Sequence, residues 1–270
     1  MMRAEILSKL QEIEKENGIE ILYACESGSR GWGFASPDSD YDVRFIYARS
    51  QSSYLSIVPK ADQLSFPINN DLDIYGWDLQ KALRLILNSN TTPFEWLQSP
   101  VIYFEKGDFK QALFELCALY FNQRKNIHHY LGIARGALES ITADAEIKIK
   151  KLFYILRPLL AAKWCLERKC IAPMEMFPLM DLLPQDVHKL VFILIGIKAK
   201  ANEGQLVKIN GNLLNYIFLE LDYCMNASAH LPKEYFDPKP LNDFFTETIA
   251  ENDNQRFKNR RSDTVGMCKW

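Results

Sequence analysis

The sequence predicts an α+β fold, in which a mixed sheet with helices is followed by an all-helical part. Short apolar segments alternate with helical patterns over roughly the first hundred residues, whereas apolar residues recur almost only at helical spacing after that. The chain has 270 residues, 48% of them hydrophobic and 24% charged. This is enough for one large domain or two modest ones, and we expect two.

The first 105 residues show the pattern of a mixed α/β domain. A helix is predicted over 4–16, because apolar residues at helical spacing precede the stop signal Asn17-Gly18. A long Gly- and Ser-rich loop covers 27–39, and Asp78 is suited to cap a helix that follows it. Strands are predicted over 19–25, 41–48, 72–75 and, at the edge of the sheet, 101–105.

Beyond a boundary near Lys106 the pattern becomes helical. Pro158 falls inside one predicted helix, and we expect it to interrupt that helix because an interior proline costs roughly 3 kcal/mol. We therefore predict an α/β domain over 1–105, a helical domain over 106–250 and a polar segment over 251–270, whose weak pattern leaves open whether it is a mobile tail. The predicted helices are 109–121, 127–140, 145–168, 185–200 and 213–225.

Composition excludes several classes of protein. The formal net charge of −2 gives no overall attraction to a polyanion, so any such attraction must come from a local patch. The six cysteines form no CxxC pair and there are only four histidines, so a zinc-type ligand array is not indicated. The longest apolar stretch, 190–197, is far shorter than the ~20 residues of a membrane span. We expect a reduced, cytoplasmic protein that does not enter a membrane.

A glycine-rich turn, Gly28-Ser29-Arg30-Gly31-Trp32-Gly33, directly follows the first predicted strand. Glycines at such a turn let backbone N–H groups approach an anion closely, so the loop is a candidate phosphate cradle. Taken alone the loop is weak support, because most glycine-rich turns only reverse the chain. Trp32 is a candidate for stacking on a base, against the commoner fate of a core aromatic.

Three aspartates form the second candidate element. Asp40 and Asp42 are two residues apart at the start of a strand, so side-chain alternation places both carboxylates on one face. Their repulsion raises one pKa unless a cation such as Mg²⁺ removes it; the alternative is two solvated turn residues. Asp73 would add a carboxylate from a neighbouring strand, whereas Asp71 looks like a turn residue. The three would supply a two-metal phosphoryl-transfer site.

The order of strand, Gly-Ser, spacer, Asp-x-Asp and a later Asp resembles the signature of the DNA-polymerase-beta superfamily of nucleotidyltransferases. More narrowly, residues 26–44, ESGSRGWGFASPDSDYDVR, resemble the nucleotidyltransferases of the RNA-repair pathway that accompany RNA ligases. The similarity extends to TPFEWLQSP at 92–100 and KLFYILRPLL at 151–160. Gly31 stands where the family usually has another small residue, which is a mild departure.

The resemblance implies a polymerase-beta-like catalytic domain over 1–105 and a helical substrate-binding domain over 106–250. It implies transfer of a nucleoside monophosphate from a nucleoside triphosphate to an acceptor hydroxyl, with an RNA 3′ end as the favoured acceptor. Asp40 and Asp42 would hold two Mg²⁺ or Mn²⁺ ions, and Asp73 would complete the ion that activates the acceptor. The nucleotide-binding residues implied are Gly28, Ser29, Arg30 and Ser39.

Two basic residues of the helical half are further candidates. We hypothesise that Lys151 and Arg157 point at the triphosphate or the acceptor backbone, the alternative being a solvated basic face with Arg157 in an interdomain salt bridge. Two rival functions stay open. One is the same chemistry on a protein hydroxyl, as in antitoxin-type relatives, or on a small molecule. The other is a non-catalytic nucleotide-binding module, which would follow if one metal carboxylate were misplaced.

Overall fold

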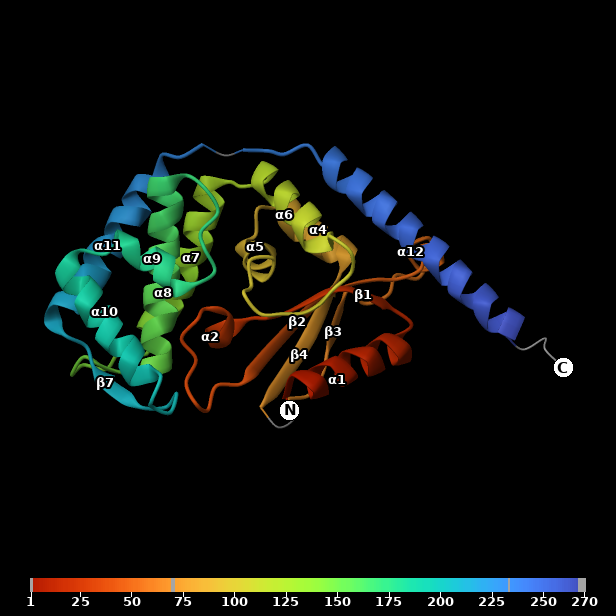
Figure 1. Cartoon of the computed structure of the whole chain (residues 1–270). Coiled ribbons are helices and arrows are strands. Elements are labelled where there is room, and N and C mark those ends of the chain that lie inside the picture. The colour runs from red at the N-terminus through yellow and green to blue at the C-terminus, as the bar shows by residue number, and fades with distance from the viewer. Residues whose placement is uncertain (1, 69–70, 233, 267–270) are drawn as a thin grey trace.

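A five-stranded mixed sheet forms the centre of the N-terminal part of the protein, which we describe from a computed structural model (Figure 1). The structure describes residues 2–68, 71–232 and 234–266, with side chains up to 254. The strand order is β3-β4-β2-β1-β5, and only β2 and β4 run parallel. The strands are β1 (Glu20–Glu26), β2 (Tyr41–Ala48), β3 (Gln63–Ser65), β4 (Leu72–Asp78) and β5 (Ile102–Glu105).

Helices cover both faces of this sheet. One face packs against α1 (Met2–Asn17), which buries Ile6, Leu10 and Ile13 there. The other face packs against α4 (Leu79–Leu87), α5 (Thr91–Trp96) and α6 (Phe109–Leu119). The Asp78 side chain accepts a 2.9 Å hydrogen bond from the N–H of Gln80, which confirms the predicted N-cap of α4. Two short helices, α2 (Gly28–Gly31) and α3 (Gln51–Tyr54), were not predicted.

The sheet and the helices packed on it form the sheet lobe. The helical lobe, residues 123–229, is built around α8 (Ile149–Arg168), most of which is buried. Pro158 lies in the middle of α8 without ending it, so the predicted interruption is wrong. Burial explains the difference, since packing of the neighbouring apolar turns on the core outweighs one lost backbone hydrogen bond. The surrounding elements are α7 (Gln123–Leu138), α9 (Met176–Leu179), η1 (Met180–Leu182), α10 (Gln185–Lys198), α11 (Gly211–Ala229) and the hairpin β6 (Glu146–Lys148) with β7 (Leu206–Lys208).

Packing onto the sheet crosses the boundary that the sequence predicted near Lys106. Helix α6 contributes Phe109, Leu113 and Cys117 to the core on the sheet, although it lies beyond the predicted boundary at 105. After α11 the chain crosses back, and α12 (Lys239–Gly266) buries Leu241 and Ile249 in the same core (Figure 1). A helical period shows which face is apolar but not which lobe covers it. Residues 251–266 continue α12, and 267–270 lie outside the described residues.

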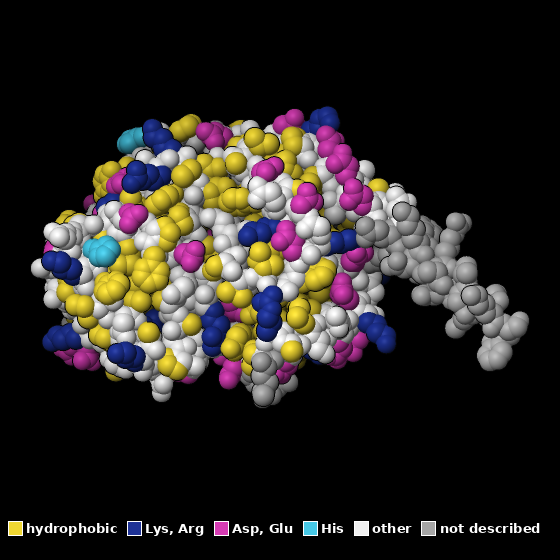
Figure 2. Space-filling view, viewed as in Figure 1, with side chains coloured by type: hydrophobic (Ala, Val, Ile, Leu, Met, Phe, Trp, Pro, Cys, Tyr) yellow, Lys and Arg dark blue, Asp and Glu magenta, His cyan; other side chains and the backbone are white. Residues whose placement is uncertain are grey.

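The surface carries both signs of charge. On the face in Figure 2, basic and acidic side chains are interspersed over both lobes and do not gather into one extended basic patch. Any attraction for a polyanion on this face is therefore local, as the net charge of −2 predicts. None of the helices within the described residues has the length and apolar character that a membrane span requires.

Candidate active site

The pairing of β2 with β4 brings two of the predicted aspartates together. Asp42 and Asp73 are direct partners in this parallel pair, so their side chains leave the sheet on the same face. Arg44, two residues after Asp42 on the same face, lies between the two carboxylates. Its Nη2 is 2.8 Å from Asp42 Oδ1 and 2.7 Å from Asp73 Oδ2. The two carboxylates are therefore close enough to share a single cation.

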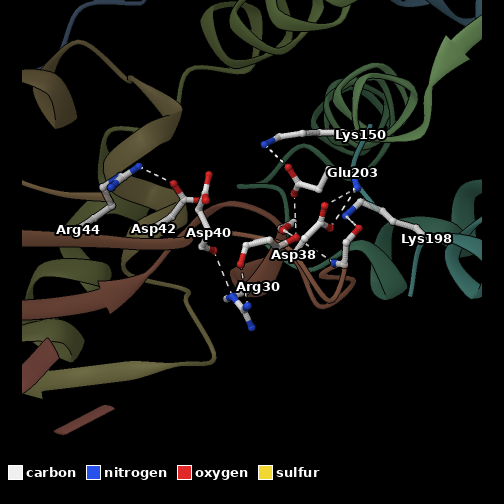
Figure 3. A network of polar contacts seen from close by, with 11 residues as sticks. Arg30, Asp38, Asp40, Asp42, Arg44, Lys150, Lys198 and Glu203 are labelled. Atoms are coloured by element: carbon white, nitrogen blue, oxygen red, sulfur yellow. Dashed lines mark hydrogen bonds and ion pairs between the residues drawn. The ribbon is translucent and has the colours of Figure 1, made fainter. Parts of the chain in front are cut away.

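Asp40 and Glu26 complete the acidic surroundings of Asp42. Asp40 precedes β2, and its carboxylate points to the same side as that of Asp42 (Figure 3). Glu26, only 1% exposed at the end of β1, accepts a 2.8 Å hydrogen bond from the N–H of Asp42 and another from the Tyr103 hydroxyl. Burial raises the pKa of Glu26, and these two hydrogen bonds oppose that rise. Glu26 thus fixes the backbone that carries Asp42.

The pKa of Asp42 reflects its burial and the repulsion within this group of carboxylates. Burial raises the pKa of Asp42; Arg44 opposes the rise, while Asp73 and Asp40 add to it. Without a metal, the charged form of Asp42 is therefore disfavoured in the folded protein. Repulsion between the aspartates, inferred from their spacing in the sequence, therefore contributes to the raised pKa of Asp42 in the folded chain.

Gly28 makes room for this group. Its φ of +56° lies in the left-handed region, and a Cβ added there would be 1.9 Å from Asp42 Oδ2. The glycine is thus required both by backbone conformation and by the close approach of a carboxylate. Although the sequence suggested that Gly28 admits a phosphate, the group that the structure places against it is Asp42.

The two candidate serines of the loop meet in a hydrogen-bonded chain. Ser29 Oγ donates to Ser39 Oγ over 3.0 Å, and Ser39 Oγ also accepts from the N–H of Ser36 over 2.9 Å. Ser39 in turn donates to Glu203 Oε1 of the helical lobe over 2.8 Å. Ser29 and Ser39 therefore lie together, and Ser39 contacts a carboxylate of the helical lobe.

Arg30 braces the loop. Its Nη2 donates to the carbonyl of Ser39 over 2.7 Å, its Nε donates to the carbonyl of Asp40 over 3.1 Å, and its guanidinium lies 3.9 Å from the Tyr41 ring centroid. Figure 3 shows the guanidinium pointing away from the Asp40 and Asp42 carboxylates. These carbonyls orient the Arg30 guanidinium, so Arg30 holds the backbone before β2, and its contact with the nucleotide stays a prediction.

The helical-lobe candidates also lie differently from the main hypothesis. Arg157 is 2% exposed and forms an ion pair with Glu95 of the sheet lobe, while Nε and Nη2 donate to the carbonyls of Met174 and Pro173. It therefore forms the interdomain salt bridge that was the alternative, and these partners engage its guanidinium. Lys151 is exposed on α8.

The lysine that faces the site is Lys150, one position earlier. It forms an ion pair with Glu203, and its charge lowers the pKa of Asp42. Burial tends to lower the pKa of Lys150 itself, but the hydrogen bond and charge of Glu203, together with Tyr154 and Asp40, leave that pKa raised. One turn further, Tyr154 has a pKa raised by burial and then by Asp42. Trp32 is buried with its ring centroid 5.1 Å from that of Tyr154, so it is a core residue and not a base-stacking surface.

The carboxylates suit a divalent ion in chemistry, but their present arrangement does not form a complete ligand set. Asp40, Asp42 and Asp73 offer only hard oxygen donors, which Mg²⁺ and Mn²⁺ prefer. Across the described residues, no three His, Cys, Asp or Glu side chains are grouped to hold a metal. Arg44 already provides the positive charge shared by Asp42 and Asp73. Holding an ion between those two carboxylates therefore requires Arg44 to move aside.

Sequence reasoning missed several of these residues. Arg44 could have been found, since the alternation that pairs Asp40 with Asp42 also puts Arg44 on that face. Lys150 needed the true start of α8, because one residue turns a helix by about 100°. Glu26 gave a weaker signal as an acid that ends an apolar strand. Glu203 gave none, since it lies in a turn 53 residues from Lys150 and 164 residues from Ser39.

The mixed sheet, the Gly-Ser turn and the paired aspartates define a nucleotidyltransferase-like protein of the polymerase beta class. Within that class, the chain belongs to the RNA repair pathway DNA polymerase beta family, whose model matches residues 2–247. The family match confirms both the resemblance drawn from residues 26–44 and the α+β fold class.

Individual proteins similar to the chain include a bacterial relative and a solved structure. The uncharacterised protein YcgL of Bacillus subtilis (strain 168) is 37% identical over 253 residues, which cover 93% of this chain and 97% of that protein. A crystal structure of a nucleotidyltransferase-like protein from Exiguobacterium sibiricum 255-15 aligns with 82% of this chain and 75% of its own. That alignment has 12% identity and a TM-score of 0.32.

Proposed function

We propose that the protein transfers a nucleoside monophosphate from a nucleoside triphosphate to the 3′ hydroxyl of an RNA, with release of pyrophosphate. The observation that carries the proposal is the placement of Asp42 opposite Asp73 on parallel strands, with Gly28 against Asp42. This arrangement concentrates negative charge beside a serine-lined turn, where a cation-bound polyphosphate would be accommodated. Membership of an RNA repair pathway family supports RNA as the acceptor.

Each residue of the site has a task in this reaction. Asp40, Asp42 and Asp73 would hold two Mg²⁺ or Mn²⁺ ions, which when bound would neutralise the phosphates and lower the pKa of the acceptor hydroxyl. Glu26 and Gly28 hold Asp42 in place through its N–H and through the space beside its carboxylate. Arg44 offsets the mutual repulsion of Asp42 and Asp73 while they carry no metal.

The direct test is to incubate the protein with each labelled nucleoside triphosphate, Mg²⁺, and one of three acceptors. The acceptors are RNA with a free or a blocked 3′ end, DNA, and proteins of a cell lysate. We expect label on RNA, and none when its 3′ hydroxyl is blocked. Label on a protein or a small molecule would overturn the RNA acceptor but keep the transfer chemistry. Nucleotide binding without label in any acceptor would instead indicate a non-catalytic module.

Asp42→Asn identifies the site within the same assay. Transfer should fall at least about a hundredfold, because the neutral side chain no longer holds the charge of the reacting centre. The folded-state pKa of Asp42 is raised, so its charge opposes folding above its ordinary pKa, and Asn should leave the metal-free protein as stable or more stable at neutral pH. Asp71→Asn is the matched control, since Asp71 is exposed in the turn before β4. Equal transfer by both variants would refute the assignment.

A further inference from the structure

Glu203 extends from the helical lobe into the candidate active site. It lies in the turn between α10 and β7, and its side chain is only 15% exposed. One carboxylate oxygen accepts a hydrogen bond from Ser39 Oγ over 2.8 Å, and the other forms an ion pair with Lys150 (Figure 3). Its own N–H donates to the Asp38 carboxylate over 3.1 Å. Both oxygens of this carboxylate are therefore engaged by groups that also suit a phosphate.

The groups around this carboxylate are rich in hydrogen-bond donors. Ser29 Oγ donates to Ser39 Oγ over 3.0 Å, and Ser39 is the serine that contacts Glu203. Lys198, 1% exposed, donates to Ser36 Oγ over 2.9 Å in the same loop. Ser39 and Lys150 thus contact the carboxylate directly, and Ser29, Ser36 and Lys198 continue the network from Ser39. Hydroxyl and ammonium donors of this kind are what an oxyanion of a phosphate requires.

The position of Lys150 connects this donor cluster with the aspartates. Lys150 is paired with Glu203, and Figure 3 shows its side chain extending from α8 toward Glu203 and the Asp40 and Asp42 carboxylates. Ser29 directly follows Gly28, which contacts Asp42. The donors therefore begin beside the carboxylates and continue away from them. A triphosphate whose reacting phosphate lies at the aspartates would extend its terminal phosphates toward Lys150 and Ser39.

We propose that Glu203 is an internal occupant of the place for the terminal phosphates of the nucleoside triphosphate, so that nucleotide binding displaces it. The proposal rests on the proposed function. A carboxylate and a polyphosphate cannot occupy this place together, because like charges repel and both need the same donors. The triphosphate carries more charge than one carboxylate and gains more from Lys150 and Lys198. Glu203 thereby keeps the donors satisfied, and both lobes in contact, while nucleotide is absent.

Binding measurements on Glu203→Gln test this exchange without relying on transfer. Affinity for ATP and for inorganic tripolyphosphate would be measured by calorimetry in the presence of Mg²⁺, with AMP as the ligand that lacks terminal phosphates. We expect both polyphosphates to bind about tenfold more tightly to the variant, because a competing internal state lowers apparent affinity by its population. Binding of AMP should not change. Glu167→Gln, the same charge change at a residue paired with Lys163 in the helical lobe, should bind all three like wild type.

The outcomes separate this inference from a purely structural contact. Unchanged or weaker binding of tripolyphosphate by a folded Glu203→Gln protein would overturn it, as would an equal gain for AMP. Lys150→Ala should bind tripolyphosphate more weakly than wild type, whereas a lysine that only fastens the lobes would leave this binding unchanged. If thermal unfolding shows that Glu203→Gln is not folded, Glu203→Asp retains the charge but is too short to reach both partners, so it should bind tripolyphosphate more tightly than wild type.

The same measurements distinguish failure of this inference from failure of the proposed function. Tighter polyphosphate binding by Glu203→Gln, with no transfer to any acceptor, would refute the transferase while supporting the displacement of Glu203. Normal transfer by wild type, with polyphosphate affinity unaffected by Glu203→Gln, would support the transferase and refute the displacement.

Discussion

Replacing Gly28 with alanine is the sharpest test of how the loop and the carboxylates are coupled. The added Cβ would lie 1.9 Å from Asp42 Oδ2 and 2.9 Å from its Cγ. To regain an ordinary contact of 3.4 Å, the carboxylate would have to retreat by about 1.5 Å. That movement takes Asp42 away from the position in which Arg44 bridges it to Asp73.

The loss of folding free energy in Gly28→Ala has two separable contributions. Alanine at a φ of +56° costs about 1–2 kcal/mol of folding free energy. Forcing Asp42 off its rotamer adds about 0.5–1.5 kcal/mol. For the reaction, a shift of this size in a catalytic group lowers the rate by roughly a hundredfold. The variant should therefore lose roughly 1.5–3.5 kcal/mol of stability and most of its transfer activity.

Gly18→Ala is the matched control. Gly18 has a φ of +59°, nearly that of Gly28, but a Cβ there meets nothing within 4 Å. Its variant should show the backbone cost without any loss of transfer. Urea unfolding and nucleotide transfer would be measured for wild type and both variants. The reasoning is refuted if Gly28→Ala is no less stable than Gly18→Ala and transfers nucleotide at the wild-type rate.

Two further predictions concern buried charges. Glu95→Gln should destabilise the protein by about 3 kcal/mol in urea unfolding, because Arg157 then lacks its anionic partner in the core. A loss of stability below roughly 1 kcal/mol would contradict a stabilising role of this ion pair between the lobes. Burial lowers the pKa of Lys198, so the unfolded chain binds more protons than the folded one between the two pKa values. Wild type should therefore gain stability relative to Lys198→Met as pH rises toward 10.5. A stability difference between the two proteins that does not change with pH would contradict a lowered pKa of Lys198.

Much of the local structure could be read from the sequence. The bounds predicted for the strand over 41–48 agree with β2, and the Asp78 cap and the buried face of α1 were also predicted. These features depend on alternation, helical spacing and capping, which act between residues a few positions apart. The family resemblance, which the family match confirms, could also be recognised in the sequence, because the motif at residues 26–44 is one continuous segment.

Only the tertiary structure decided which distant groups meet. The register of β2 with β4 sets Asp42 opposite Asp73, and the start of α8 turns Lys150 inward. The fold also pairs Arg157 with Glu95 and brings Glu203 to the glycine-rich loop. The sequence by itself determined which side chains carry charge and on which local face they lie. Their partners depend on packing between lobes, because contacts across long separations leave no periodic signal in the chain.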